Sequence, residues 1–222
     1  ADVDFEIKRQ LVHGFGGILI ASAAYTLIPK IGALTAIPLF VGVLLFSMLP
    51  QISRMLHLHN ELMTKFERSG DVEHTPYKGA INYGLGILPA VILLNAPQAA
   101  AVIMILSVGD AASTIVGVSV GRTKVTFQDS LGLYRKIVYR EFDSRLLNYL
   151  SRKVGRTSSS HKTLEGFMGF MLGAFAGAVF FVGIIESIFL AIAGGFIELL
   201  VPLDDNISIP WILTILLLAF VH

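Results

Sequence analysis

Residues 166–201 read GFMGFMLGAFAGAVFFVGIIESIFLAIAGGFIELLV, a run of 36 residues in which only Glu186 and Glu198 carry charge. A helix needs roughly 20 apolar residues to cross a hydrocarbon core about 30 Å thick. The run is too long for one crossing, so it predicts two transmembrane helices. We expect the chain to break between them at Glu186.

Five further apolar blocks flank this run, at residues 11–28, 31–49, 80–94, 98–120 and 209–221. Only Pro29 and Lys30 separate the first two blocks, and a short segment with Asn95 and Pro97 separates the next two, so each pair is expected to form a hairpin. The chain is 54% hydrophobic and 15% charged, with a mean hydropathy of +0.72, which leaves too little polar surface for a soluble globule of 222 residues. We therefore predict an all-α integral membrane protein, a single transmembrane domain over residues 1–222 with about seven transmembrane helices.

The basic residues predict the orientation of these helices. Sixteen of the 17 lie in three segments, namely before the first block, in residues 50–79 and in residues 122–162, and Lys30 alone lies on the other side. Because Lys and Arg in short loops are retained in the cytoplasm, the N-terminus and all three segments are predicted to be cytoplasmic. An alternative interpretation takes Lys8, Arg9 and the run to residues 21–23 (Ala-Ser-Ala) as a cleaved secretory signal. The apolar block continues past that site to Ile28, which favours a retained helix.

The segment 122–162 carries ten basic residues against three acidic ones, a balance of +7. Apolar residues recur there at helical spacing, as they do in the loop 50–79, so both loops are predicted to hold amphipathic helices at the membrane surface. Residues 127–158 are interpreted as a basic cytoplasmic insertion that binds anionic lipids. Retention of the segment in the cytoplasm by its charge alone is an equally good explanation.

Ionisable groups that border or enter a membrane usually mark a functional site, because burying them is costly. Four such groups of residues are present: Lys8, Arg9 and His13; Asp110 with Arg122; Lys162 with Glu165; and Glu198 with Asp205 and Asn206. On the predicted topology all four reach the cytoplasmic face. Carboxylates beside Lys and Arg are the side chains that hold a hard divalent cation and a polyphosphate.

Glycines 169, 173 and 177 recur at i, i+4 spacing on the first helix of the long apolar run. Such a stripe favours close packing against a neighbouring helix, and a groove for substrate is the less favoured interpretation.

Taken together, these motifs resemble the CTP-dependent polyprenol kinase family, which includes dolichol kinase, phytol kinase and the CTP-using diacylglycerol kinase. The resemblance follows chain order over nearly the whole sequence through four segments: EIKRQLVH at 6–13, GDAASTIVG at 109–117 with Gly121 and Arg122, KTLEG at 162–166, and Glu198 with DNISIP at 205–210. It differs in the connector between Gly121 and Lys162, which is much shorter in that family and which bears on substrate identity more than on reaction type.

The resemblance implies transfer of the γ-phosphoryl group of CTP to the hydroxyl of a prenol (dolichol, phytol or geranylgeraniol type) or of diacylglycerol, with Mg²⁺ as cofactor. It implies that Asp110 and Asp205 hold the metal, that Lys162 and Arg122 contact the CTP phosphates together with Gly166 and Asn206, and that Glu165 positions the metal or the hydroxyl. Assisting roles fall to Lys8, His13 or Glu198. The expected partners are CTP, the lipid alcohol and anionic membrane lipids, with no nucleic acid.

Two other functions are compatible with the sequence. A lipid cytidylyltransferase, which makes a CDP-lipid, also needs CTP and an acidic metal site in the membrane, but it releases pyrophosphate where a kinase releases CDP. A small transporter is the alternative that is not an enzyme. It would be expected to show two matched halves with ionisable residues at mid-membrane, and the sequence shows neither.

Overall fold

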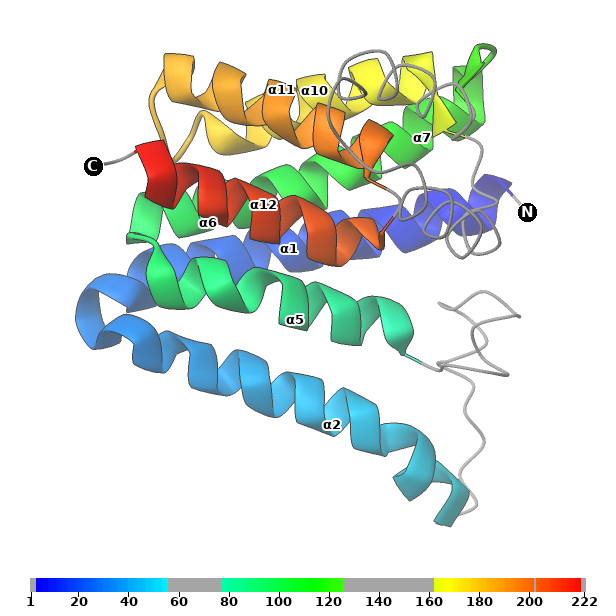
Figure 1. Cartoon of the computed structure of the whole chain (residues 1–222). Helices are drawn as coiled ribbons and strands as arrows, with labels where there is room; N and C mark the ends of the chain where they lie inside the picture. The colour runs from blue at the N-terminus through cyan, green and yellow to red at the C-terminus, as the bar shows by residue number, and fades with distance from the viewer. Residues whose placement is uncertain (1–2, 56–76, 126–161, 202, 221–222) are drawn as a thin grey trace, which may run out of the picture.

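The computed structural model describes residues 3–55, 77–125, 162–201 and 203–220 (Figure 1). In these residues the chain is helical throughout, apart from short connections and one small ribbon. The α-helices are α1 (Val3–Ile31), α2 (Ala36–Met55), α5 (Lys78–Leu93), α6 (Ala96–Met104), α7 (Asp110–Val120), α10 (Leu164–Ala178), α11 (Ile184–Leu200) and α12 (Asp205–Phe220). A 3₁₀-helix, η1 (Gly32–Thr35), joins α1 to α2, and a π-helix, η2 (Ile105–Gly109), joins α6 to α7.

The predicted all-α class is confirmed in the described residues, with one addition. Two-residue strands β1 (Lys124–Val125) and β2 (Lys162–Thr163) pair antiparallel. Two stretches are long and apolar enough to cross a membrane by length and composition: Val3–Pro50, which contains the turn between α1 and α2, and Ala96–Val120, which contains α6, η2 and α7. Helices α5, α10 and α12 are apolar but shorter. The amphipathic helices predicted in the two loops and the basic insertion 127–158 lie outside the described residues.

The first hairpin turns later than the sequence predicts. Helix α1 continues through Pro29 and Lys30 and ends at Ile31. Gly32 then adopts a left-handed conformation, with φ of 57°, which glycine reaches without the steric penalty of a Cβ atom. The reversal is therefore set by Gly32 and not by Pro29, which is accommodated within the last turns of the helix.

The run 166–201 forms two helices, as predicted, but the break lies before Glu186. Helix α10 ends at Ala178, whose carbonyl accepts hydrogen bonds from the backbone N–H groups of Phe181 and Val182 in the turn that follows. Gly183 is extended and precedes the first residue of α11, so that Glu186 lies in the first turn of that helix. An acidic residue in a first turn is favourable for the helix dipole.

Helix α10 packs closely against α7 and η2 along its glycines. A Cβ atom on Gly173 would lie 2.7 Å from both Ala112 Cβ and the Val108 carbonyl oxygen. A Cβ atom on Gly169 would lie 2.9 Å from Val116, and one on Gly177 would lie 3.1 Å from Met104. The predicted close packing of this stripe is therefore confirmed. It fixes the position of α7, which begins at Asp110.

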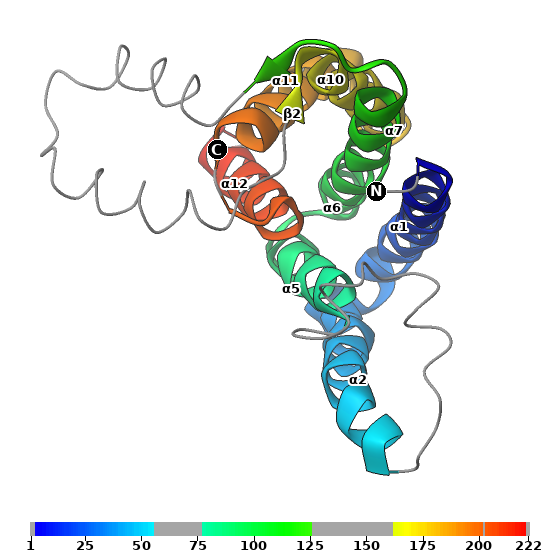
Figure 2. The ribbon, with the colours of Figure 1, turned by 90° about the vertical axis from the view of Figure 1, so that its right-hand side faces the viewer.

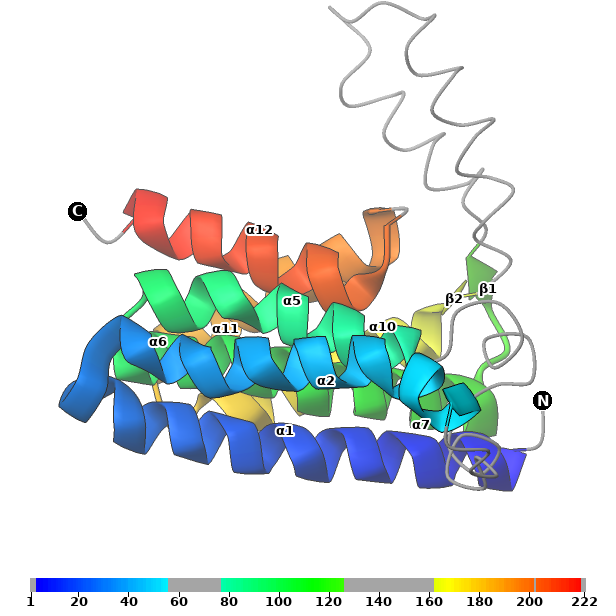
Figure 3. The ribbon, with the colours of Figure 1, turned by 90° about the horizontal axis from the view of Figure 1, so that it is seen from below.

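The helices run back and forth along a common direction, so the chain passes repeatedly between two ends of the bundle (Figure 1). Figure 2 looks from the end that carries the start of α1 and shows α2 at the edge, beside α5. The same end of the bundle carries the C-terminal ends of α7 and α11 and the N-terminal ends of α10 and α12. The β1–β2 ribbon lies there too (Figure 3). Among the described residues, the charged motifs on α1, α7, β2, α11 and α12 therefore lie toward one end of the bundle.

Candidate functional site

The centre of this charged end is an ion pair between a lysine and an aspartate from distant parts of the chain. Lys162 belongs to β2, and Asp205 is the first residue of α12. Lys162 Nζ lies 3.0 Å from both carboxylate oxygens of Asp205 and also donates to the backbone carbonyl oxygen of Glu198. Both side chains are about one quarter exposed, at 22% and 26%. The ammonium group is thus held by two elements while a part of it stays accessible.

A second contact links α11 to α7. Glu198 is buried, and its Oε1 accepts a 2.7 Å hydrogen bond from the Ser113 hydroxyl. Ser113 lies one helical turn after Asp110, and the Asp110 carboxylate acts electrostatically on both Glu198 and Asp205. Asp110, Glu198 and Asp205 therefore share one field with Lys162.

Asp110 follows an irregularity that the sequence does not reveal. The π-helix η2 interrupts the rod from Ala96 to Val120 and ends at Gly109, immediately before Asp110. π-Helical turns within α-helices occur frequently at functional sites. A Cβ atom on Gly109 would lie 3.0 Å from the Phe170 ring, so that α10 packs closely at this point. The extra residue in the turn changes which face of α7 carries Asp110, Ser113 and Thr114.

Helix α1 completes the site from the other side of α7. His13 Nε2 lies 3.8 Å from Asp110 Oδ2, and the His13 ring makes an edge-on contact with Tyr83 of α5 at 5.0 Å between ring centroids. The Tyr83 hydroxyl lies 2.8 Å from the Ser107 hydroxyl in η2. The structure thus places His13, one of the residues expected to assist, beside Asp110. Lys8 is exposed on α1 and lies outside these contacts.

Glu165 lies at the start of α10 and holds the β1–β2 ribbon to that helix. Its carboxylate accepts hydrogen bonds from the Thr123 backbone N–H, at 3.2 Å to each oxygen, and from the Thr123 hydroxyl at 3.1 Å. Its own backbone N–H and these donors hold the pKa of the Glu165 carboxyl below its usual range. Arg122 is exposed just before Thr123. In this arrangement Glu165 orders the segment that carries Arg122.

Gly166 is buried, and its backbone N–H donates to the Thr163 hydroxyl, which caps α10. A Cβ atom on Gly166 would lie 3.1 Å from the Ser113 carbonyl oxygen, so this glycine also allows α10 to approach α7. Asn206 follows Asp205 in α12, and its side-chain Oδ1 is buried without a hydrogen-bond partner among the described residues.

The metal assignment can be tested against these contacts. Within the described part of the chain, no three His, Asp or Glu side chains gather closely enough to hold a metal ion by themselves. Mg²⁺ commonly uses only one or two protein carboxylates and takes its other ligands from water and substrate phosphates. The buried, unpartnered Oδ1 of Asn206 beside Asp205 is an oxygen ligand of the type that Mg²⁺ prefers. Asp110, Asp205 and Asn206 therefore offer oxygen donors of the type that Mg²⁺ uses, but the described residues do not gather them into a complete metal-binding group.

Sequence reasoning missed three contributors: Ser113, Gln10 and Asn82. Each is a polar residue on a helix that is otherwise apolar over most of its length, and that is the signal that could have found them. Gln10 Nε2 donates to Thr114 Oγ1 at 2.9 Å, so it joins α1 to α7. Asn82 Nδ2 donates to Asp204 Oδ2 at 2.8 Å, so it joins α5 to the segment before α12.

Asn82 is expected to hold Asp205 and Asn206 in place, because Asp204 also accepts the backbone N–H of Asn206 at 3.1 Å. Replacing Asn82 with Leu should leave Asp204 without its donor from α5 and let the start of α12 shift. We expect a loss of about 1 to 2 kcal/mol in stability. Thermal unfolding measures the effect. An unchanged unfolding temperature would show that the hydrogen bond between Asn82 and Asp204 does not hold the start of α12 in place.

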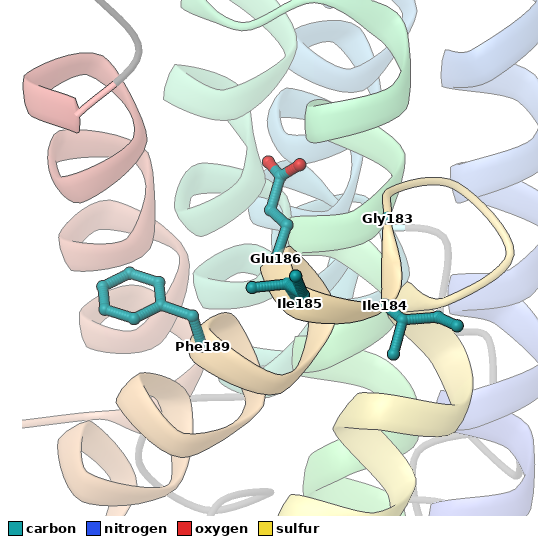
Figure 4. Close-up of a pocket in the computed structure, with 5 residues that line it drawn as sticks. All are labelled: Gly183, Ile184, Ile185, Glu186 and Phe189. Atoms are coloured by element: carbon teal, nitrogen blue, oxygen red, sulfur yellow. The ribbon is translucent and has the colours of Figure 1, made fainter.

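A separate pocket lies at the opposite end of α11 from Glu198. It is open, mostly apolar and lined by Gly183, Ile184, Ile185, Glu186 and Phe189 (Figure 4). Figure 4 shows these side chains diverging around the start of the helix, and Glu186 supplies the only charge among them. This pocket lacks the converging polar groups of the Lys162–Asp205 end, which is therefore the better candidate site.

Comparison of the chain with known proteins adds no relative to this description: no protein-family model, no curated protein and no solved structure matches it. The candidate site is therefore defined by the contacts of its own residues.

Proposed function

We propose that this protein is a lipid kinase of the membrane, which transfers the γ-phosphoryl group of CTP to the hydroxyl of a long-chain lipid alcohol. One observation carries the proposal most strongly. Asp110, Lys162, Glu198 and Asp205 come from four different elements and meet at one end of the bundle. The motif resemblance to the CTP-dependent polyprenol kinases concerns these same residues, and it supplies the choice of CTP and of a lipid alcohol.

In the proposed reaction the hydroxyl oxygen of the alcohol attacks the γ-phosphorus, and the bond from that phosphorus to the bridging β–γ oxygen breaks. CDP leaves with the bond electrons, and the hydroxyl proton is released. Phosphoryl transfer asks a protein mainly for positioning and for neutralisation of charge. The partly exposed ammonium of Lys162 is suited to the phosphate oxygens. Arg122, on the segment ordered by Glu165, is suited to the outer part of the nucleotide.

Magnesium, held by Asp110 and Asp205 with Asn206, would neutralise the negative charge on the phosphate oxygens. Until a nucleotide arrives, Lys162 offsets part of the charge of Asp205 and keeps the start of α12 in place. The Ser113 hydroxyl donates a hydrogen bond to the side-chain carboxylate of Glu198. The backbone carbonyl of Glu198 accepts a hydrogen bond from Lys162 and so orients it. Lys162, Glu198 and Asp205 are thus held in place relative to one another before the substrate binds.

We further propose that the helical rods cross the membrane about seven times, with the site at the cytoplasmic face. Large apolar side chains are exposed along the helices, for example Phe15 at 65%, Leu172 at 69% and Ile215 at 62%. Exposed apolar surface of this extent calls for a lipid environment. Single cysteines introduced at Gly70, Ser158 and Leu203, which is 63% exposed before the start of α12, are expected to react from the cytoplasmic side with a reagent that does not cross the membrane. A cysteine at any of these positions that reacts only from the outside would contradict the topology.

The reaction is tested with the purified protein, Mg²⁺, CTP labelled on the γ-phosphate, and separate additions of phytol, geranylgeraniol, dolichol and diacylglycerol and of the phosphates of these lipids. A kinase acts on the alcohol and gives CDP and a labelled lipid phosphate. A cytidylyltransferase acts on the lipid phosphate, releases labelled pyrophosphate and leaves a CMP group on the lipid phosphate. Formation of pyrophosphate would therefore replace the kinase proposal with that alternative, and no turnover of CTP with any of these lipids or their phosphates would overturn both.

A further inference from the structure

The seam between α1 and α7 contains buried polar atoms that the proposed phosphoryl transfer does not use. Gln10 is 1% exposed, and its Nε2 donates to Thr114. Its Oε1 and His13 Nε2 are both buried without a hydrogen-bond partner in the described residues. Buried polar atoms are nearly always paired in folded proteins, so two unpaired atoms one helical turn apart point to a ligand with polar atoms of its own.

The two atoms face the reactive end of α7. On α1, Gln10 and His13 are one turn apart, and on α7 Asp110 and Thr114 are one turn apart, so the pairs lie opposite one another. The distance of 3.8 Å between His13 Nε2 and Asp110 Oδ2 is too long for a direct hydrogen bond. A hydroxyl group placed between His13 and Asp110 could form a hydrogen bond with each of them. The nearby Gln10 Oε1 could also accept a hydrogen bond from such a hydroxyl group.

Apolar surface adjoins this seam on the outer side of α1. Leu11, Val12 and Phe15 are 60%, 56% and 65% exposed, and they alternate along the helix with the buried face that carries Gln10 and Gly14. A hydrocarbon chain lying on this surface would have its polar end at the level of Gln10 and His13. A soluble metabolite would gain no binding energy from these exposed apolar side chains. A lipid with one terminal polar group could contact the apolar surface with its chain and the buried polar atoms with its polar end.

The seam is narrow, which limits the shape of that polar end. A Cβ atom on Gly14 would lie 3.6 Å from Ala111 Cβ, and one on Gly17 would overlap Ser107 and lie 3.0 Å from the Tyr83 hydroxyl. Helices this close together admit the slim end of a single chain more readily than a glycerol that carries two ester arms.

We infer that Gln10 and His13 bind the hydroxyl of the acceptor and select a single-chain primary alcohol of the prenol class over diacylglycerol. This inference rests on the proposed function. Gln10 and His13 act as positioning residues that hold the hydroxyl oxygen next to Asp110, at the end of the bundle where Lys162 and Asp205 would hold the nucleotide. No further covalent step is involved.

The test measures steady-state kinetics of the full chain in lipid nanodiscs with phytol, with diacylglycerol, and with the hydrocarbon phytane as a competitor that lacks the hydroxyl. Gln10→Leu removes the unpaired oxygen and keeps the bulk of the side chain. We expect the KM for phytol to rise at least tenfold and the KM for CTP to stay within twofold. The advantage of phytol over phytane in binding should fall by the same factor, because only the hydroxyl contact is lost.

The KM values for the two substrates separate this role from a structural one. Gln10→Leu also removes the hydrogen bond from Gln10 Nε2 to Thr114 Oγ1, so the unfolding temperature should fall in either case. If Gln10 serves only to pair α1 with α7, the variant should affect the KM values for phytol and CTP equally. If it binds the hydroxyl, only the KM for phytol should rise. His13→Phe keeps the ring against Tyr83 and should also raise the KM for phytol, and His13→Gln, which restores a hydrogen-bonding group, should recover part of the loss.

Turnover by the wild-type protein distinguishes failure of this inference from failure of the proposed function. If the wild type transfers no phosphate to any alcohol, both are overturned. If it is active and folded Gln10→Leu keeps its KM for phytol and its preference over phytane, the hydroxyl assignment alone is wrong. Equal kcat/KM for diacylglycerol and phytol in the wild type would overturn the selection of a single-chain alcohol.

Discussion

Replacing Lys162 with methionine should lower the rate of CTP-dependent phosphoryl transfer by about a hundredfold to a thousandfold. Methionine keeps the apolar stem and removes the ammonium that lies 3.0 Å from both oxygens of Asp205. Loss of a charge-assisted contact to the transferring phosphate costs about 3 to 4 kcal/mol in the transition state, which gives this factor. Steady-state turnover with saturating CTP and phytol measures the effect.

Lys124→Met is the matched control, because Lys124 lies on the partner strand of the same ribbon with its side chain exposed. It should retain turnover within a few-fold of the wild type. Methionine at position 162 also leaves the Asp205 carboxylate without its cation, so unfolding and CTP binding must be measured in parallel. Near-normal turnover by a folded Lys162→Met variant would show that the ion pair is a structural link between β2 and α12.

Asp110, Lys162 and Asp205 should act as one unit in phosphoryl transfer. Asp205→Asn and Asp110→Asn keep size and hydrogen bonding but remove charge, and each should lower turnover by orders of magnitude, with partial recovery at high Mg²⁺. Because residues that act together are not additive, the double variant Lys162→Met, Asp205→Asn should be scarcely slower than the worse single variant. If the fall in turnover of the double variant equals the product of the falls in the two single variants, the residues act independently.

Gly173→Ala should destabilise the packing of α10 against α7. Its methyl group would lie 2.7 Å from Ala112 Cβ and from the Val108 carbonyl oxygen, and backbone cannot yield as a flexible side chain can. We expect α10 to move away from α7, at a cost of about 1 to 3 kcal/mol. Asp110 and Ser113 would be displaced with α7, so turnover should fall as well. Thermal unfolding in a fixed detergent measures the loss.

Gly16→Ala is the matched control, since it makes the same chemical change within helix α1 where nothing lies within 4 Å of the added Cβ. Alanine is favoured over glycine in a helix interior by up to about 1 kcal/mol, so this variant should be neutral or slightly more stable. If both variants unfold at the wild-type temperature, close approach along the α10 glycines does not limit stability.

Several features of the fold could be predicted because they depend on local composition. Apolar blocks of helical length predict helices wherever they occur, and the structure has helices at every block. The stripe of Gly169, Gly173 and Gly177 predicts close packing, because a face without side chains lets two backbones approach. The turns were less predictable. Gly32, with its positive φ, sets the first turn, and the 179–183 connection sets the second. Proline and the isolated charge of Glu186 did not mark either turn correctly.

The charged residues of the candidate site could be predicted, but their contacts and their polar partners Ser113, Gln10 and Asn82 could not. Asp110, Lys162, Glu198 and Asp205 stand out because charge is rare in apolar sequence, and the distribution of basic residues indicates that they share one end. Their pairing could not be read in the same way, since Lys162 and Asp205 are 43 positions apart and Ser113 and Glu198 are 85 apart. Partners so distant in the chain are chosen by helix packing.

The sequence by itself determined that this chain is helical, apolar and charged chiefly at one end, because these properties follow from which residues occur and how they are spaced. The tertiary structure alone decided that Lys162 pairs with Asp205, that Glu165 secures the Arg122 segment, and that Gln10 and His13 face Asp110. The physical reason is that a contact between two side chains depends on how each of the two helices is rotated about its axis and shifted along it. The glycines of α10 and the π-helix before Asp110 set those quantities, and their effect appears only when the helices are packed together.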